Sequence, residues 1–278
     1  MRRIHCTLSV VFLFVSAVTV LAQETGAVSP VPIPVATRSQ VYCTGFIANA
    51  PVPRDLYVVG GADDDFHSVV RQFAQGESIF ISHQESGNLA VGAEYSVVRP
   101  ANELFLTMHY QQERSNIARL GKPYEDVAQV RVTQVNQEGA VATVTFSCGP
   151  IVPGDLLMPF QPRDIPEYTV SSPLDPFVPL DKNKHQGRIV ASHNNIGYFG
   201  QDTIVYLNLG ENDGAKPGQR FRIYKLIPPH MRIFMLSQPT PPETLGEAVI
   251  LSVQGKSSVA MVVSSYREIS AGDFVEAE

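Results

Sequence analysis

The amino-acid sequence predicts a mainly β protein: two tandem small β-barrel domains, SH3-like in kind, joined by a Pro-rich linker. Three observations support this fold class. Apolar and polar residues alternate over Thr203–Lys225, Gly-containing turns interrupt the alternation, and the pattern occurs twice. A period of two is typical of strands with one buried face. About five to seven short strands per repeat suit a barrel or a partly open sandwich, which hides the sheet edges.

Paired blocks of sequence indicate an internal duplication. The blocks occur in the same order in both halves, and each half ends in Ile-x-x-Gly-Asp. Such self-similarity is the signature of repeated structural units. The alternative is that Val- and Gly-rich β segments resemble one another through composition alone. The matched blocks are Ile79–Arg99 with Val205–Lys225, Val127–Leu157 with Leu245–Val275 and, upstream, Gly45–Ile47 with Gly187–Ile189.

Residues 1–22 are predicted to be a signal peptide. Arg2 and Arg3 precede an apolar run over Leu8–Leu21, and Val20-Leu21-Ala22 supplies small residues before Gln23. This order of features is typical of a cleaved secretory signal. An uncleaved anchor is the alternative, although the run is short for a membrane span of about 20 apolar residues. We expect no transmembrane segment after cleavage.

Charge restricts the class of partner. The chain carries a net charge of −6, which becomes more negative once Arg2 and Arg3 are removed. Nucleic-acid binding requires clustered Lys and Arg against the phosphates, so nucleic acid is not expected as a partner. The chain contains no Trp, which excludes a Trp-based sugar platform and leaves Tyr and Phe platforms open.

Two cysteines remain after loss of the signal segment, Cys43 and Cys148. An even number of cysteines in an exported chain favours a disulfide. The position that matches Cys148 in the second repeat is Tyr266. We therefore expect a Cys43–Cys148 disulfide within the first domain. Two separate buried thiols are the alternative.

The order of domains follows from the positions of the proline-rich stretches. Residues 23–40 are expected to form a Pro-rich tether, and residues 41–160 the first barrel-like domain. Residues 161–186 contain repeated prolines, which remove backbone donors and stiffen a chain. This linker leads to the second barrel-like domain, residues 187–278.

Three local elements are expected within the first domain. Apolar residues have helical spacing over Phe66–Ala74, which favours a short helix there. Glu103–Tyr110 has the pattern of a strand. Ser115–Leu120 is expected to form a helical turn that Gly121 ends before Pro123.

The second domain resembles a known family. Asp202–Gly210, Asp213–Phe221 and Ile269–Asp273 are similar to the C-terminal β domain of flagellar assembly protein T. They also resemble related domains of bacterial envelope proteins that often carry LysM modules. The resemblance covers most of the second domain and, through the repeat, part of the first. It implies a periplasmic or outer-membrane-associated, non-catalytic protein.

Motifs for catalysis, metals or cofactors do not stand out. Asp63–His67 is the nearest to a metal cluster, but it lacks the alternating carboxylates of a calcium loop, and a solvated acidic turn is the simpler interpretation. Ser82-His83 and Ser192-His193 are sequence neighbours, which point to opposite faces of a strand. No nucleophile elbow or phosphate-binding loop occurs. We therefore expect a non-enzyme without a cofactor or a metal.

Two apolar stretches are candidate partner surfaces. The string Ile233, Phe234, Met235 and Leu236 lies in a Pro-bounded excursion, where exposed apolar residues would mark an interaction surface. Tyr198 and Phe199 lie between two glycines and could contact a protein or a glycan. For both stretches, packing into the core is the alternative interpretation.

The sequence thus predicts an exported scaffold or protein-interaction module of the cell envelope. The expected location is the periplasm, the outer membrane or the exterior, and the expected partner is an envelope protein or a cell-wall component. A module that binds peptidoglycan or another glycan is the alternative, and a pull-down on insoluble cell wall separates the two.

Overall fold

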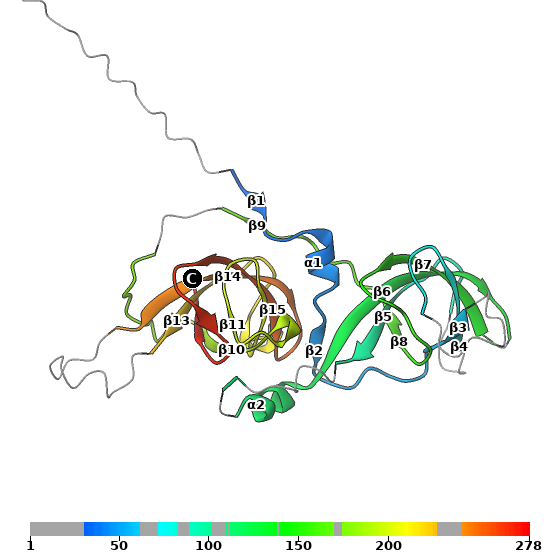
Figure 1. Cartoon of the computed structure of the whole chain (residues 1–278), viewed down its shortest axis with the longest axis horizontal. Helices are drawn as coiled ribbons and strands as arrows, with labels where there is room; N and C mark the ends of the chain where they lie inside the picture. The colour runs from blue at the N-terminus through cyan, green and yellow to red at the C-terminus, as the bar shows by residue number, and fades with distance from the viewer. Residues whose placement is uncertain are drawn as a thin grey trace, which may run out of the picture. The chain divides into compact units, whose positions relative to one another are not determined.

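The computed structural model describes residues 31–61, 72–82, 89–101, 109–110, 112–137, 139–169, 174–226 and 241–278 (Figure 1). The protein is mainly β, as predicted. No helix among these residues has the length and apolar character needed to cross a membrane. In chain order the elements are β1 (Ile33–Pro34), α1 (Arg38–Tyr42), β2 (Phe46–Ala48), β3 (Val58–Gly61), β4 (Ser78–Ser82), β5 (Glu94–Pro100), α2 (Glu113–Leu120), β6 (Lys122–Val135), β7 (Gly139–Ser147), β8 (Leu156–Pro159), β9 (Glu167–Tyr168), β10 (Gln186–Ser192), η2 (His193–Asn195), β11 (Tyr198–Phe199), β12 (Ile204–Leu207), η3 (Glu211–Asp213), β13 (Arg220–Lys225), β14 (Glu243–Val253), β15 (Ser258–Ser265), β16 (Ile269–Ser270) and β17 (Phe274–Ala277).

The C-terminal half forms a closed barrel of six antiparallel strands, in the order β10-β12-β15-β14-β13-β17. Strand β10 closes the barrel by pairing with β17, and the separate β11–β16 pair accompanies it. Inward residues at alternate positions, such as Val205 and Leu207 on β12, fill the core. The predicted strand-turn-strand unit over Thr203–Lys225 is therefore confirmed as β12, η3 and β13.

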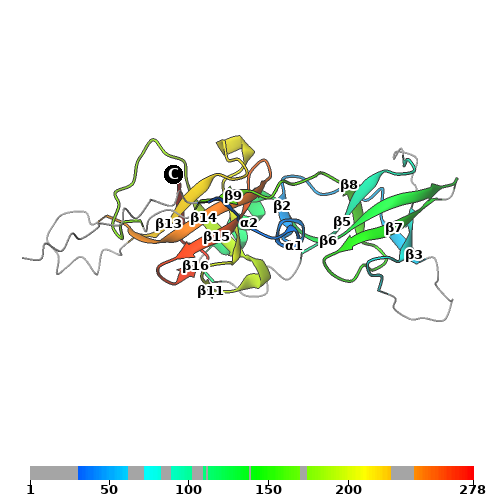
Figure 2. The ribbon, with the colours of Figure 1, turned by 90° about the horizontal axis from the view of Figure 1, so that it is seen from above.

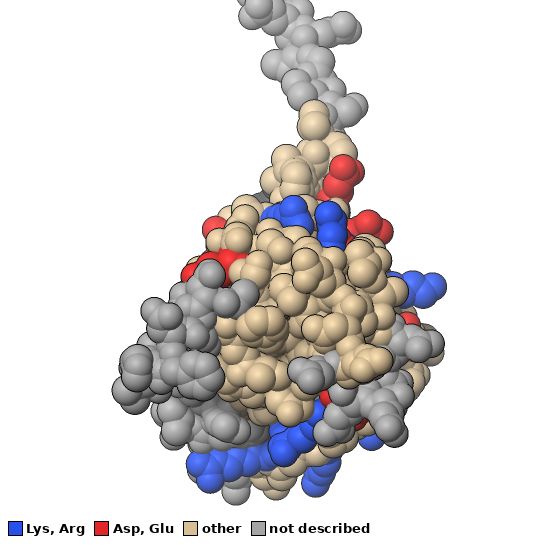
Figure 3. Space-filling model, turned by 90° about the vertical axis from the view of Figure 1, so that its right-hand side faces the viewer, with Lys and Arg blue, Asp and Glu red and all other residues tan. Residues whose placement is uncertain are grey.

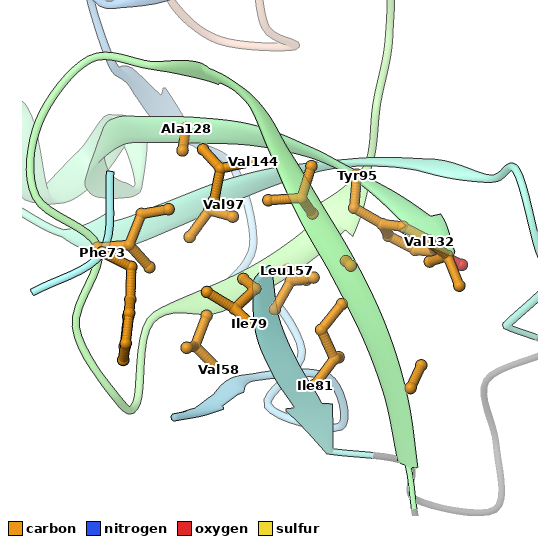
Figure 4. Close-up of a cluster of buried hydrophobic side chains, with 14 of the residues drawn as sticks. Val58, Phe73, Ile79, Ile81, Tyr95, Val97, Ala128, Val132, Val144 and Leu157 are labelled. Carbon is orange, nitrogen blue, oxygen red and sulfur yellow. The ribbon is translucent and has the colours of Figure 1, made fainter. Parts of the chain in front are cut away.

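The N-terminal half forms an antiparallel sheet in the order β3-β4-β7-β6-β5-β8, with β2 also paired to β6. Its inward side chains make a second core (Figure 4). A second closed barrel was predicted, but the structure shows a sheet here. Edge strands β3 and β8 meet at one bridge, Tyr57 to Leu156, rather than along a ladder. Strand β3 is short because Pro51 and Pro53 precede it and the chain bends over residues 54–56.

The sheet and the barrel have the same strand order, which supports the predicted repeat. Their registers also agree: Phe80 pairs with Val141, and the matching Tyr206 pairs with Val259. Register shifts recur at equivalent places, for example after Val58 and after Ile189. The equivalent strands are β3 and β10, β4 and β12, β5 and β13, β6 and β14, β7 and β15, and β8 and β17.

One predicted match is wrong. Gly45–Ile47 was aligned with Gly187–Ile189, but Val58 is the structural counterpart of Ile189. The N–H of Val58 donates to the carbonyl of Asp155, as the N–H of Ile189 donates to the carbonyl of Asp273. The mistake arose because a short Gly-x-apolar pattern fits many strand starts.

The Cys43–Cys148 disulfide is present, with 5.3 Å between the Cα atoms. It links the end of α1 to the segment after β7 within the N-terminal half. A disulfide is typical of proteins that fold in oxidising compartments outside the cytoplasm.

The C-terminal end of the predicted tether is helical rather than extended. Thr37 forms a capping box with Gln40, which starts helix α1 before the expected domain boundary. Strand β1 pairs with β9 from the predicted linker. The linker itself is anchored to the barrel, since the Tyr168 hydroxyl lies 3.1 Å from a carboxylate oxygen of Glu247.

The expected local elements have mixed outcomes. The helical turn over Ser115–Leu120 is confirmed within α2, which ends before Gly121. Most of the predicted helix Phe66–Ala74 lies outside the described residues, although Phe73 itself is extended and bridges Ile151. The predicted strand Glu103–Tyr110 also falls mainly outside them, as does Asp63–His67.

Candidate interaction site

One outer face of the barrel is buried. It is formed by outward residues of β10, β12, β14 and β15, and we call it the barrel face. Helix α1, strand β2 and helix α2 cover it, contributing Val41, Ile47, Ile117 and Leu120. Figures 1 and 2 both show α1 and β2 lying between the barrel and β6. The barrel face consists of Val190, Ile204, Tyr206, Leu251, Val259 and Met261.

Polar contacts fix this covered face. The Tyr206 hydroxyl donates to the carbonyl of Thr44 at 2.5 Å, and the Ser257 hydroxyl donates to the carbonyl of Ile47 at 3.0 Å. Burial raises the pKa of Tyr206, so the phenol remains neutral and keeps its donor. Because these donors bind carbonyls near β2, they set the position of the covering elements as well as their contact area.

The equivalent face of the N-terminal sheet is not covered in the same way. We call it the sheet face. Val59 and Phe80 on it are 53% and 42% exposed, whereas their barrel counterparts Val190 and Tyr206 are buried. Thr133 is also exposed, and the remaining members are half-buried. The sheet face consists of Val59, Ser78, Phe80, Thr133, Val141 and Thr143, in the same order as their barrel counterparts above.

The six residues of the sheet face are uncharged, and the Arg131–Glu94 ion pair borders them opposite Thr143. Three of its positions hold Ser or Thr where the barrel face holds Ile, Leu or Met. Two others are Val in both faces, and Phe80 stands where the barrel face has Tyr206. In Figure 3 the viewer looks at the side of the chain that carries β3, β4 and β7. A broad area on this side has no Lys, Arg, Asp or Glu. The composition lies between that of a solvated surface and that of a core, as expected for an interaction patch that spends time in water.

A groove of about 550 Å³ lies beside the disulfide, between the start of β6 and η2. Its strongest polar groups are engaged. The Arg99 guanidinium binds the Asp155 carboxylate at 2.7 Å, and His193 Nδ1 lies 3.3 Å from the Tyr206 hydroxyl. Burial lowers the pKa of His193, which favours its neutral form. Because these side chains bind one another, the groove is better explained as part of the structure than as a ligand site.

The predicted aromatic pair separates in the structure. Phe199 is buried in the barrel core, where it occupies the position that Phe73 has in the N-terminal core, so it is not part of a partner surface. Tyr198 is 68% exposed and remains a candidate contact. The apolar string Ile233, Phe234, Met235 and Leu236 lies outside the described residues.

Ser192 and His193 have different partners, as the sequence led us to expect, and His83 lies outside the described residues. The Ser192 hydroxyl bonds to the backbone of Ile196, whereas His193 contacts Tyr206. Ser82 accepts from the N–H of Tyr57. Within the part of the chain that the structure describes, no group of three or more His, Cys, Asp or Glu is placed to hold a metal ion.

The sequence contained a signal for the barrel face that was not used. Ile204–Leu207 and Val259–Val262 are continuous apolar runs, as expected for strands buried on both sides. Their counterparts Ser78–Ile81 and Val141–Val144 are interrupted by Ser or Thr. Tyr206 takes a polar position in the alternation over Thr203–Lys225, so the sequence pattern predicted a solvated outer face here instead of a covered one.

Comparison with known proteins adds no family. No family model matches the chain, and no curated protein matches it.

Proposed function

We propose that this chain is an exported, non-catalytic envelope protein that works as a scaffold by binding a partner protein through the sheet face. One observation carries this proposal. The six residues of the sheet face are uncharged and exposed or half-buried, while the equivalent barrel face is buried under apolar side chains. A fold that uses this face once for docking has the geometry to use it a second time.

The repeat supports a scaffold rather than a catalyst. The two halves share strand order, register and core positions, which we attribute to duplication of one SH3-like barrel unit. The Arg99–Asp155 pair of the groove matches Lys225 and Asp273 in the other half, so this pair belongs to the repeated fold rather than to a catalytic site. Export is supported by the signal-like N-terminus and by the disulfide. The resemblance to the β domain of flagellar assembly protein T favours the same setting.

The test is capture of partners from envelope extract with the full chain and with Phe80→Glu. Because Phe80 is 42% exposed, the substitution should leave the fold intact while placing a charge at the centre of the sheet face. We expect the captured proteins to be lost with Phe80→Glu and retained with Val91→Glu, a matched change at an exposed turn residue. Equal capture by all three chains would remove the sheet face from the proposal.

A glycan-binding module remains the second candidate because Tyr198 is an exposed aromatic residue. Aromatic rings exposed at a surface can stack against sugars. Sedimentation with purified insoluble cell wall separates the two functions. Binding that survives Phe80→Glu and is lost with Tyr198→Ala would favour the glycan function.

A further inference from the structure

Each half of the chain has two parts that matter for docking: an acceptor and a donor. The acceptor is the outer face just described. The donor is the excursion that joins β5 to β6 in the first half and β13 to β14 in the second. These are the fifth and fourth strands of each pairing order. In sequence these excursions are residues 101–121 and 226–242.

The first donor is occupied within the chain. It contains α2, whose Ile117 and Leu120 lie three residues apart and pack on the barrel face. The Glu113 carboxylate accepts from the N–H of His109 at 2.6 Å and so holds the start of α2. The excursion of the first half therefore docks on the acceptor of the second half, together with α1 and β2.

The duplicated fold supplies one further acceptor and one further excursion at the equivalent places. The acceptor is the sheet face. The donor is the second excursion, of which residues 227–240 lie outside the described residues. Its sequence holds the apolar string Ile233–Leu236 and one charged residue, Arg232.

We propose that the sheet face binds the 227–240 segment of a second copy of this chain, so that copies associate head to tail. The inference rests on the proposed function and names the partner of the same face. It repeats between chains the donor–acceptor relation that the structure shows within one chain. Because donor and acceptor are different surfaces, the contact is heterologous and can continue from copy to copy.

Charge favours this occupant. The chain carries a net charge of −6, so two copies repel each other over most of their surface. The sheet face has no charge and residues 227–240 have no acidic residue, so this pair of surfaces avoids the repulsion. The cation that borders this face, Arg131 opposite Thr143, is already paired with Glu94.

Sedimentation velocity of the full chain over a range of concentrations tests the proposal. We expect the average mass to rise with concentration and to pass that of a dimer. Phe80→Glu on the acceptor and Phe234→Glu on the donor should each weaken association about tenfold or more, because each would bury an unpaired charge. Val91→Glu is the control and should associate like the original chain. Thr143→Glu is a second acceptor variant that applies if Phe80→Glu does not fold.

A mixture of the two variants gives the decisive result. The Phe80→Glu chain keeps a working donor and the Phe234→Glu chain keeps a working acceptor, so together they should form a dimer that grows no further. A mixture that stays monomeric, or a Phe234→Glu chain that associates like the original, would overturn the proposal. If the original chain is monomeric throughout yet captures an envelope protein through the sheet face, the proposed function stands and the head-to-tail partner is rejected.

Discussion

The barrel face and the sheet face have the same place in the fold and opposite surroundings. Tyr206 is buried against α1 and β2, while its counterpart Phe80 is 42% exposed. The backbone around both residues is alike, since each pairs with an equivalent Val on the neighbouring strand. The comparison shows that strand order and register are set by the inward residues, whereas outward residues determine what each copy of the fold binds.

We expect the largest difference in stability when an acidic residue is introduced at equivalent positions of the two faces. Leu251→Asp would place an unpaired carboxylate under the covering elements and should lower the free energy of unfolding by about 3–5 kcal/mol. The equivalent change Thr133→Asp lies at an exposed position and should alter it by about 0.5 kcal/mol or less. Urea denaturation of both variants gives the two values. Similar losses would show that the faces do not differ in burial.

Loss of the disulfide is expected to have the next largest effect on stability, and only the N-terminal half should be destabilised. Replacing Cys43 and Cys148 with Ala should remove about 2–4 kcal/mol of stability through the freedom gained by the unfolded chain. The barrel has Tyr266 where the sheet has Cys148, so it should be unaffected. Calorimetry with and without reductant, read together with hydrogen exchange of each half, measures this. An equal increase in hydrogen exchange in the barrel would contradict this prediction.

A smaller effect is expected from exchanging the aromatic residues of the two faces. Tyr206→Phe removes the hydroxyl that donates to the carbonyl of Thr44, which should cost about 1–2 kcal/mol because that buried carbonyl loses its donor. Phe80→Tyr adds a hydroxyl that water can reach and should be nearly neutral. Thermal unfolding of both variants checks the pair. A neutral Tyr206→Phe would mean that the hydrogen bond does not hold the covering elements.

The smallest effect concerns pH. Burial lowers the pKa of His193 below 6.5, so the unfolded chain takes up a proton at this residue more readily than the folded chain. The stability contributed by neutral His193 is therefore present above about pH 6.5 and is lost as the pH falls through that region. Denaturation at roughly pH 7.5 and roughly pH 5.5 should show a smaller loss for His193→Gln than for the original chain. The same loss in both chains would assign the pH dependence to other groups.

Much of the fold could be predicted from the sequence because inward positions carry strong local signals. The alternation over Ile79–Ile81 and over Val205–Leu207, and the glycines at equivalent turns such as Gly92 and Gly218, fixed the equivalent strands. The disulfide followed from an even number of cysteines. These features depend on neighbours that are close in sequence or on simple counting.

Whether each sheet closes into a barrel, and the covering of the barrel face, could not be predicted in the same way. Both depend on contacts between segments that are distant in sequence. Whether β3 pairs fully with β8 depends on the bend before Val58, which the first half has and the second lacks. The burial of Tyr206 depends on α1 and β2, which precede it by more than half of the chain. A Tyr within an alternating pattern is compatible with either a covered or a solvated face.

Side-chain footprinting with hydroxyl radicals tests the central claim most directly, because it reports the exposure of both faces in one sample. In dilute protein, Phe80 should be labelled readily, while Tyr206 and Met261 should be protected. In concentrated protein Phe80 should become protected, and Tyr206 and Met261 should not change. Labelling of Phe80 that is independent of concentration, or ready oxidation of Met261 in the folded dilute chain, would contradict the account.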